Sequence, residues 1–136
     1  MELTVTRFGN IKYDKSDIIR MVKGFLGFEH LKQFIVVSLE GQEPFKWFQS
    51  IEDQNIAFLM IDPLFFKPDY VVDIAPREIV ALQASSLEDI TLFVLVTIPA
   101  GQPEKMSANL QGPLAINMKD NCAAQLVLGE SNYNPM

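Results

Sequence analysis

Side chains able to act as nucleophiles or general bases are few in this sequence. It contains one histidine, His30, and one cysteine, Cys122. Nucleophilic catalysis needs a nucleophile within hydrogen-bond reach of a base, and neither residue has an evident partner in the sequence. His30 is interpreted as an exposed loop residue, and Cys122, at the start of a predicted strand, as a small packing residue. We therefore predict that the protein is not an enzyme.

Three aspartates offer another route to chemistry. Asp62, Asp69 and Asp73 lie close together in the sequence, and converging carboxylates can bind a hard cation. However, Asp62 precedes Pro63 and Asp69 follows Pro68, positions where aspartate commonly shapes turns. Turn formation without metal or cofactor is the favoured interpretation. A small metal-dependent hydrolase that uses the three aspartates is kept as the alternative.

The aromatic residues suggest a recognition surface. They concentrate in the first half of the chain, several in predicted loops beside glycine or proline: Phe25, Phe28, Phe45, Trp47, Phe48, Phe65, Phe66 and Tyr70. Core packing explains Trp47 or Phe48, because neighbouring residues of a strand point to opposite faces. It explains the pair Phe65–Phe66 less well. Exposed aromatics rimmed by acids are typical of protein-recognition surfaces, so an interaction patch and core packing both stay open for this pair.

The charge balance excludes one class of partner. Seventeen acidic residues oppose eleven basic ones, which gives a net charge of −6. A nucleic-acid binder usually clusters basic residues on one face to neutralise phosphates, whereas the three arginines here (Arg7, Arg20 and Arg77) are widely separated. Direct binding of RNA or DNA is therefore not expected. The acidity suits either a basic protein partner or simply solubility.

Length and hydropathy suggest one soluble domain. The chain has 136 residues, a length typical of a single domain. The N-terminal residues 1–4 carry no secretory signal, and the longest strongly apolar stretch, Leu92–Val96, is far shorter than a membrane span. We expect a cytoplasmic protein with one domain over residues 1–130 and a flexible tail over residues 131–136.

The hydrophobic pattern predicts short strands and little helix. Strands are expected at Leu3–Val5, Ile11–Tyr13, Phe34–Leu39, Phe45–Ser50, Ile56–Ile61, Tyr70–Ile74, Leu92–Ile98, Leu114–Met118 and Cys122–Leu128, with a turn at Gly9-Asn10 and a helical turn from Pro76 to Gln83. Residues 16–24 fit either a short helix or a strand. The predicted fold class is mostly β: an antiparallel barrel-like or sandwich domain with one or two short helices.

Ordered motifs run through these same segments. They are Gly24-Phe25-Leu26-Gly27-Phe28-Glu29 with Phe34, Gln49-Ser50-Ile51-Glu52-Asp53 with Ala57-Phe58, Asp62-Pro63, Phe66-Lys67-Pro68-Asp69-Tyr70, and Asn109-Leu110-Gln111-Gly112-Pro113-Leu114-Ala115-Ile116-Asn117 with Gln125-Leu126-Val127-Leu128. In order and spacing, over nearly the whole chain, they resemble the family of bacterial flagellar assembly factors called FliW. This chain departs from the family at Val22 and Leu26, where proline is frequent, and at Gly112, where alanine is frequent and the exchange is expected to be harmless.

The resemblance implies a regulatory protein with two protein partners. FliW-like proteins bind flagellin in the cytoplasm and also bind CsrA, a small dimeric repressor of translation. While flagellin is plentiful it occupies the FliW-like protein, and CsrA is free to block flagellin translation. As flagellin is exported, the FliW-like protein binds CsrA, away from its RNA surface, and relieves the block. A flagellin chaperone without a role in translation is the remaining alternative.

We place the expected partner surface on turn and loop residues. The candidates are Glu52, Asp53, Asp69 and Tyr70, with Phe25 and Phe28 as further members. Asn109 and Asn117 are expected to satisfy backbone groups at strand ends rather than to contact a partner.

Overall fold

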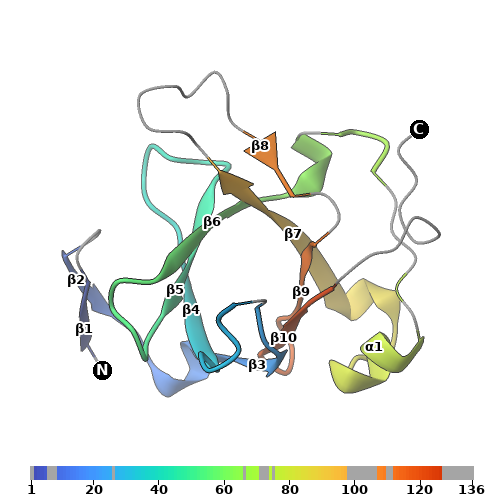
Figure 1. Cartoon of the computed structure of the whole chain (residues 1–136), viewed down its shortest axis with the longest axis horizontal. Helices are drawn as coiled ribbons and strands as arrows, with labels where there is room; N and C mark the ends of the chain where they lie inside the picture. Colours follow the sequence, from blue (N-terminus) through green and yellow to red (C-terminus); the bar gives the residue numbers. More distant parts are fainter. Residues whose placement is uncertain are drawn as a thin grey trace.

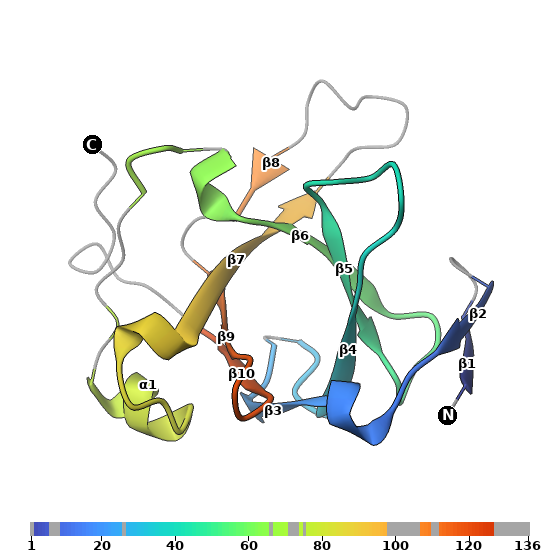
Figure 2. The ribbon, with the colours of Figure 1, turned by 180° about the vertical axis from the view of Figure 1, so that it is seen from behind.

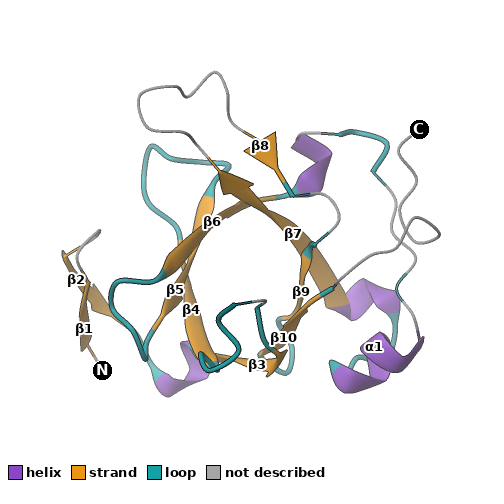
Figure 3. Ribbon diagram, viewed as in Figure 1, coloured by secondary structure: helices purple, strands orange, loops and turns teal. Residues whose placement is uncertain are grey.

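Strands are the main regular element of the described chain (Figure 3). The computed structural model describes residues 2–5, 9–25, 27–65, 67–70, 74, 76–97, 107–109 and 112–126. The strands are β1 (Glu2–Val5), β2 (Gly9–Lys12), β3 (Ile19–Lys23), β4 (Gln33–Val37), β5 (Lys46–Ser50), β6 (Ala57–Ile61), β7 (Ile90–Thr97), β8 (Ser107–Ala108), β9 (Leu114–Asn117) and β10 (Cys122–Gln125). The helices are α1 (Pro76–Ala81) and the 3-10 turns η1 (Lys15–Asp17), η2 (Pro63–Phe65) and η3 (Leu87–Asp89).

Seven of the described strands close into a barrel (Figures 1 and 2). Around the ring the order is β6-β5-β4-β3-β10-β9-β7, and a second pairing of β7 with β6 completes it. Strand β8 pairs with the end of β7, and β1 pairs with β2 in a separate hairpin beside the barrel. The predicted barrel-like, mostly β domain is confirmed, and the sandwich form is excluded because the ring is closed.

One seam of the barrel differs from the antiparallel prediction. The β3–β10 pair is parallel, whereas the other named pairs of the ring are antiparallel. Parallel neighbours need a long connection, and here most of the barrel lies between Lys23 and Cys122. The chain therefore closes the ring by bringing its early and late strands together.

Most of the predicted elements agree with the structure. Strands β4, β5 and β6 and the β9–β10 hairpin lie where the pattern places them, and α1 begins at Pro76 as expected for a proline in the first turn. The ambiguous segment 16–24 contains both alternatives in part, because η1 ends at Asp17 and β3 starts at Ile19.

One local prediction is wrong, and a second fails at the two of its residues that the structure describes. Gly9 and Asn10 belong to β2 and not to a turn, because Gly9 pairs directly with Val5 across the hairpin. Tyr70 and Ile74 do not lie in a strand. The residues between them fall outside the described ranges, as do Ile98, the expected loop at 100–105, the end of the last predicted strand and the predicted tail at 131–136.

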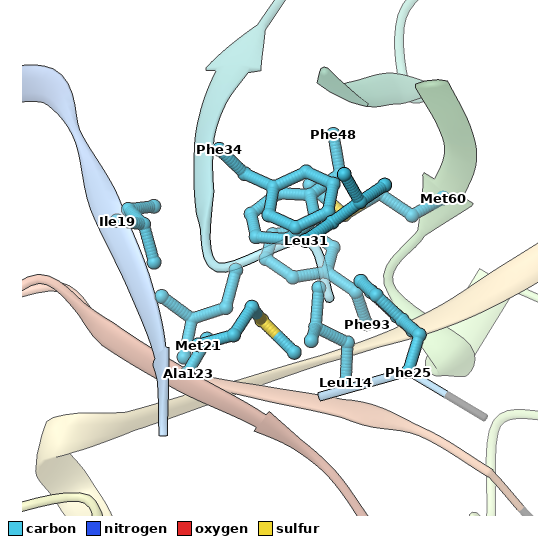
Figure 4. Packing of buried hydrophobic residues seen from close by; sticks show 11 residues of the cluster. Ile19, Met21, Phe25, Leu31, Phe34, Phe48, Met60, Phe93, Leu114 and Ala123 are labelled. Carbon is cyan, nitrogen blue, oxygen red and sulfur yellow. The ribbon is translucent and has the colours of Figure 1, made fainter. Parts of the chain in front are cut away.

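The barrel interior is filled mainly by aromatic and large aliphatic side chains (Figure 4). Phe34 and Phe48 are fully buried and stack with ring centroids 4.5 Å apart. They lie on neighbouring strands β4 and β5, and the other members of the cluster are Ile19, Met21, Phe25, Leu31, Met60, Phe93, Leu114, Ile116 and Ala123. Inward-facing residues of every strand of the ring thus meet in one core.

Strand β7 is apolar on both faces, as its sequence predicts. Phe93 points into the barrel cluster, whereas Val94 packs in an outer cluster with Ile61 and Val96. A third cluster forms where Leu82, just after α1, covers Ala115 and Cys122 on the outside of β9 and β10. The barrel wall therefore has two apolar clusters on its outer side, and the cluster around Leu82 holds the segment after α1 against β9 and β10.

The loop between β3 and β4 closes part of the barrel. Phe25 is 2% exposed and contacts the rings of Phe34, Phe48 and Phe58, with centroids 5.6, 5.9 and 4.4 Å away. Its backbone bridges to Phe28, and in Figure 1 the loop crosses the lower part of the ring. The loop therefore acts as a plug that inserts an aromatic ring into the core.

At the tip of this plug the Gly27 N–H donates to Glu29 Oε2 at 2.9 Å. This bond, helped by the Glu29 backbone N–H, holds the pKa of the Glu29 carboxyl below its ordinary value. The side chain is exposed, so the bond orders the turn more than it adds to stability.

Gly112 sits in a tight place before β9. A Cβ at this position would lie 2.8 Å from Asn109 Nδ2 and 3.1 Å from Gln125 Nε2. An alanine at this position would therefore require the Asn109 amide to move. Exchanging glycine for alanine at position 112 would need local repacking, so the two residues are not equivalent there, in contrast to the harmless exchange expected from the sequence.

None of the helices in the described ranges is long and apolar enough to cross a membrane.

Candidate interaction site

The β5–β6 connection is an acidic turn held by its own side chains. Ser50 Oγ accepts hydrogen bonds from the backbone N–H groups of Glu52 and Asp53 at 3.1 and 3.0 Å. Asp53 Oδ1 in turn accepts from the Asn55 N–H at 3.0 Å. These local bonds favour a turn over continued strand, so the two carboxylates predicted from the sequence are presented from an ordered loop.

Glu52 also joins this turn to the neighbouring strand. Its Oε1 atom accepts hydrogen bonds from the backbone N–H groups of Lys32 and Gln33, the latter at 2.8 Å. A carboxylate has two oxygens and accepts several bonds, so Oε2 keeps capacity for a donor from outside. Glu52 thus has a structural role that the sequence did not indicate.

Gln49 supports the turn from below. Its side chain is fully buried, and Nε2 donates to the carbonyl oxygens of Ser50, Ile56 and Gln54 at 2.8, 3.1 and 3.3 Å. Its Oε1 has no hydrogen-bond partner among the described residues. Gln49 lies on the outer side of β5, opposite Phe48, and the turn folds over it.

These residues border a polar surface hollow of about 570 Å³. It lies where the plug loop meets the β5–β6 turn and is lined by His30, Leu31, Glu52, Asp53, Gln54 and Asn55. Carboxylate and amide oxygens accept hydrogen bonds from cationic groups. The hollow can therefore receive arginine or lysine side chains, or backbone N–H groups, of a partner.

The structure separates the six predicted partner-binding residues. Glu52 and Asp53 line the hollow, and Phe28 lies half-buried beside it, where its carbonyl accepts the Leu31 N–H. Phe25 is buried in the core, and Tyr70 is 7% exposed. Asp69 is exposed and forms a 3.1 Å ion pair with Lys67.

The hollow also contains residues that sequence reasoning did not select. The sequence indicates His30 only as an exposed loop residue, which its exposure confirms, and it does not single out Gln54 or Asn55. The signal available in the sequence was the Ser-x-Glu-Asp spacing of the turn. Nothing in the sequence linked that turn to the loop twenty residues earlier, which the bonds from Lys32 and Gln33 to Glu52 connect to it.

Of the three aspartates, Asp62 behaves as the turn interpretation predicts. Asp62 Oδ1 accepts the Leu64 N–H at 2.9 Å and shapes the start of η2, and Asp69 pairs with Lys67. Asp73 lies outside the described residues. Within the described part of the chain, no three histidine, cysteine, aspartate or glutamate side chains are grouped to hold a metal ion.

The η2 turn exposes apolar surface. Leu64 and Phe65 are 51% and 65% exposed, and Phe66 lies outside the described residues. Core packing therefore does not account for Phe65, and the interaction-patch interpretation stays open for it.

Cys122 is buried, and its Sγ donates to the Leu82 carbonyl oxygen at 2.9 Å. The packing role predicted for this residue is confirmed. Burial raises the pKa of its thiol, so the reactive thiolate is suppressed at neutral and mildly alkaline pH. We expect labelling by an aromatic disulfide reagent at pH 8 to be about 100-fold slower in the native protein than in denaturant. Labelling at equal rates in the two conditions would contradict this placement, and Cys122→Ser gives the blank.

Together, the closed ring and the turn that carries Glu52 and Asp53 define a small β-barrel domain that presents carboxylates on a loop. The profile of the FliW protein family matches residues 2–135. The flagellar assembly factor FliW of Treponema denticola is 44% identical over 135 residues, covering 98% of this chain and 90% of that protein. The corresponding protein of Thermoanaerobacter pseudethanolicus is 39% identical over 134 residues, covering 98% and 89%.

The fold agrees with these sequence relationships. A crystal structure of the flagellar assembly factor FliW matches with a TM-score of 0.89 and 30% identity, covering 98% of this chain and 93% of that one. The chain belongs to the FliW family, and the resemblance stated from its motifs is confirmed.

Proposed function

We propose that this protein is a non-enzymatic, cytoplasmic regulator of flagellum assembly that binds flagellin and CsrA. In the proposed cycle, flagellin occupies the protein until it is exported. The released protein then binds CsrA and antagonises its repression of flagellin translation. Membership of the FliW family over nearly the full chain carries this proposal, because the relatives are named flagellar assembly factors.

The polar hollow that Glu52 and Asp53 line, called the acidic hollow from here on, supports CsrA as a partner. A repressor that binds RNA must carry basic surface, and this chain has a net charge of −6. Complementary fields of this kind accelerate association and orient docking. Glu52 and Asp53, presented from an ordered turn, are the groups we assign to that contact.

Direct association is the first test. Purified protein is mixed with flagellin, with CsrA and with both, and the complexes are sized by analytical ultracentrifugation. Complexes with each partner are expected. Failure to bind either partner would refute the proposal, and binding of flagellin alone, without an effect on CsrA repression in a translation assay, would favour the chaperone alternative.

Neutralising the hollow should weaken the CsrA complex. Glu52→Gln with Asp53→Asn keeps the oxygen acceptors for the Lys32, Gln33 and Asn55 N–H groups but removes two charges. We expect about 10-fold weaker binding at low salt and a shallower salt dependence, because rim charges act mainly through the long-range field. Both are measurable by titration calorimetry.

A matched pair controls for net charge. Glu40→Gln with Glu88→Gln also removes two exposed carboxylates, and neither residue lines this hollow. This pair should leave the affinity within about twofold. Equal loss in both double variants, or unchanged affinity of the hollow variant at low salt, would show that CsrA does not use this site.

A further inference from the structure

A second hollow lies at the opposite end of β5 from the acidic turn. It measures about 360 Å³ and is lined by Gly41, Gln42, Glu43, Phe45, Trp47 and Leu59. The acidic hollow lies after the last residue of β5, whereas this one lies at the start of β5, beside the β4–β5 loop. That loop is at the upper left of Figure 1. The proposed function described above makes no use of it.

The wall of this hollow belongs to the outside of the barrel. Phe48 points into the core, so its neighbour Trp47 faces outward. Trp47 is directly opposite Leu59 in the β5–β6 pair, and both side chains are half-buried. Leu59 and Phe45 pack against the outer cluster of Ile61, Val94 and Val96, which fixes the apolar wall in place.

The loop above this wall is fixed by hydrogen bonds. Trp47 Nε1 donates to Gln42 Oε1 at 3.0 Å, which sets the orientation of the indole ring. Lys46 Nζ donates to Ser38 Oγ at 2.9 Å and ties the two ends of the loop together. Gly41 has φ +83, which a residue with a side chain rarely adopts. The hollow is thus formed before a ligand arrives.

We propose that this hollow binds an arginine side chain from a basic segment of a protein partner. Three apolar side chains can cover the methylene stem, the indole of Trp47 can stack with the planar guanidinium, and the exposed Glu43 can accept its N–H groups. An arginine side chain would thus contact the apolar side chains, the indole and the carboxylate of the lining at the same time. An aliphatic side chain would offer the Glu43 carboxylate no N–H group and would gain nothing from its charge.

The charge of the molecule favours the same choice. The chain carries −6 overall, and the charged side chain among the lining residues is the carboxylate of Glu43. Lys46, the first residue of β5, follows this loop, and its ammonium group bonds to Ser38. The inference rests on the proposed function only in taking the partner to be a protein, and it does not depend on which protein that is.

The sole tryptophan of the chain gives a site-specific signal. Trp47 is the one tryptophan among the 136 residues, so the ¹⁵N-labelled protein has one indole N–H resonance, from the atom bonded to Gln42. The probe is a capped glycyl-arginyl-glycine peptide. The matched probe carries norleucine, which keeps the apolar stem without the charge.

We expect the arginine peptide to shift the indole resonance and saturate, with at least about fivefold higher affinity than the norleucine peptide. Glu43→Gln should weaken the arginine peptide about 3- to 10-fold and leave the norleucine peptide unchanged. Glu40→Gln, in the same loop but outside the lining, should have less than about a twofold effect.

Three results would overturn the inference: no shift with the arginine peptide, equal binding of the two peptides, or equal loss in Glu40→Gln and Glu43→Gln. This test is separate from that of the proposed function. A protein that binds flagellin and CsrA but ignores the arginine peptide retains the proposed function and lacks this site. The reverse result retains the site and removes the proposed partners.

Discussion

Replacing Phe34 with alanine is expected to lower the free energy of unfolding by about 3–5 kcal/mol. Phe34 is fully buried, stacks on Phe48 at 4.5 Å and meets the edge of Phe25 at 5.6 Å. The plug loop and two strands close around this ring, so the cavity left by its removal cannot collapse without moving all three. Urea unfolding followed by far-ultraviolet circular dichroism measures the loss.

Phe65→Ala is the matched control for this variant. It removes the same side chain from a site that is 65% exposed, so a change within about 0.5 kcal/mol is expected. If Phe34→Ala lost less than about 1.5 kcal/mol, with an unchanged dependence on urea, the aromatic cluster would not be the main support of the barrel.

The second large effect is expected at Asn117. This side chain is fully buried at the end of β9, and its Nδ2 donates to the Leu82 carbonyl at 2.7 Å. Its Oδ1 accepts the backbone N–H groups of Lys119 and Asp120 at 3.1 and 3.3 Å. Asn117→Ala should destabilise the protein by about 2–4 kcal/mol. The Lys119 and Asp120 N–H groups lose their acceptor, and the Leu82 carbonyl loses its amide donor and is left with the weaker thiol donor of Cys122.

The position of Leu82 makes this prediction specific. Asn117 joins the β9–β10 turn to the segment after α1, so hydrogen exchange of amides in Leu82 to Ala84 should accelerate in Asn117→Ala. The neighbouring Met118, which is 52% exposed, provides the control, and Met118→Ala should change neither stability nor exchange. A loss below about 1 kcal/mol, or unchanged exchange after α1, would exclude the tethering role.

The local sequence pattern predicted the strands whose side chains serve mainly to pack the barrel wall. Phe34–Leu39, Ile56–Ile61 and the last hairpin were recognisable because β-branched and apolar residues fill a pleated wall. The segment from Tyr70 to Ile74 has the same composition, yet neither end residue is in a strand. An apolar composition indicates that a segment will be buried. Whether the segment forms a strand depends on a second strand to pair with, and the local sequence does not specify that strand.

The candidate sites divide in the same way. Glu52 and Asp53 were identifiable from turn chemistry. The role of Glu52 as an acceptor for Lys32 and Gln33 was not, because these segments come together through the β4–β5 pairing, which the turn sequence does not specify. Likewise, Phe25 is in a glycine-framed loop that suggests exposure, but the closed ring offers an interior that its side chain fills.

The sequence alone determined four features of this protein: its acidic composition, its few catalytic groups, its mostly β fold class and its FliW-like motifs. They depend on residue types and on short-range spacing, which the linear chain contains in full. The tertiary structure decided which carboxylates share a hollow, that the ring closes through a parallel seam, and that Trp47 borders a second hollow with Glu43. Those features come from contacts between segments distant in sequence, and such contacts are settled only when the whole barrel packs against one core.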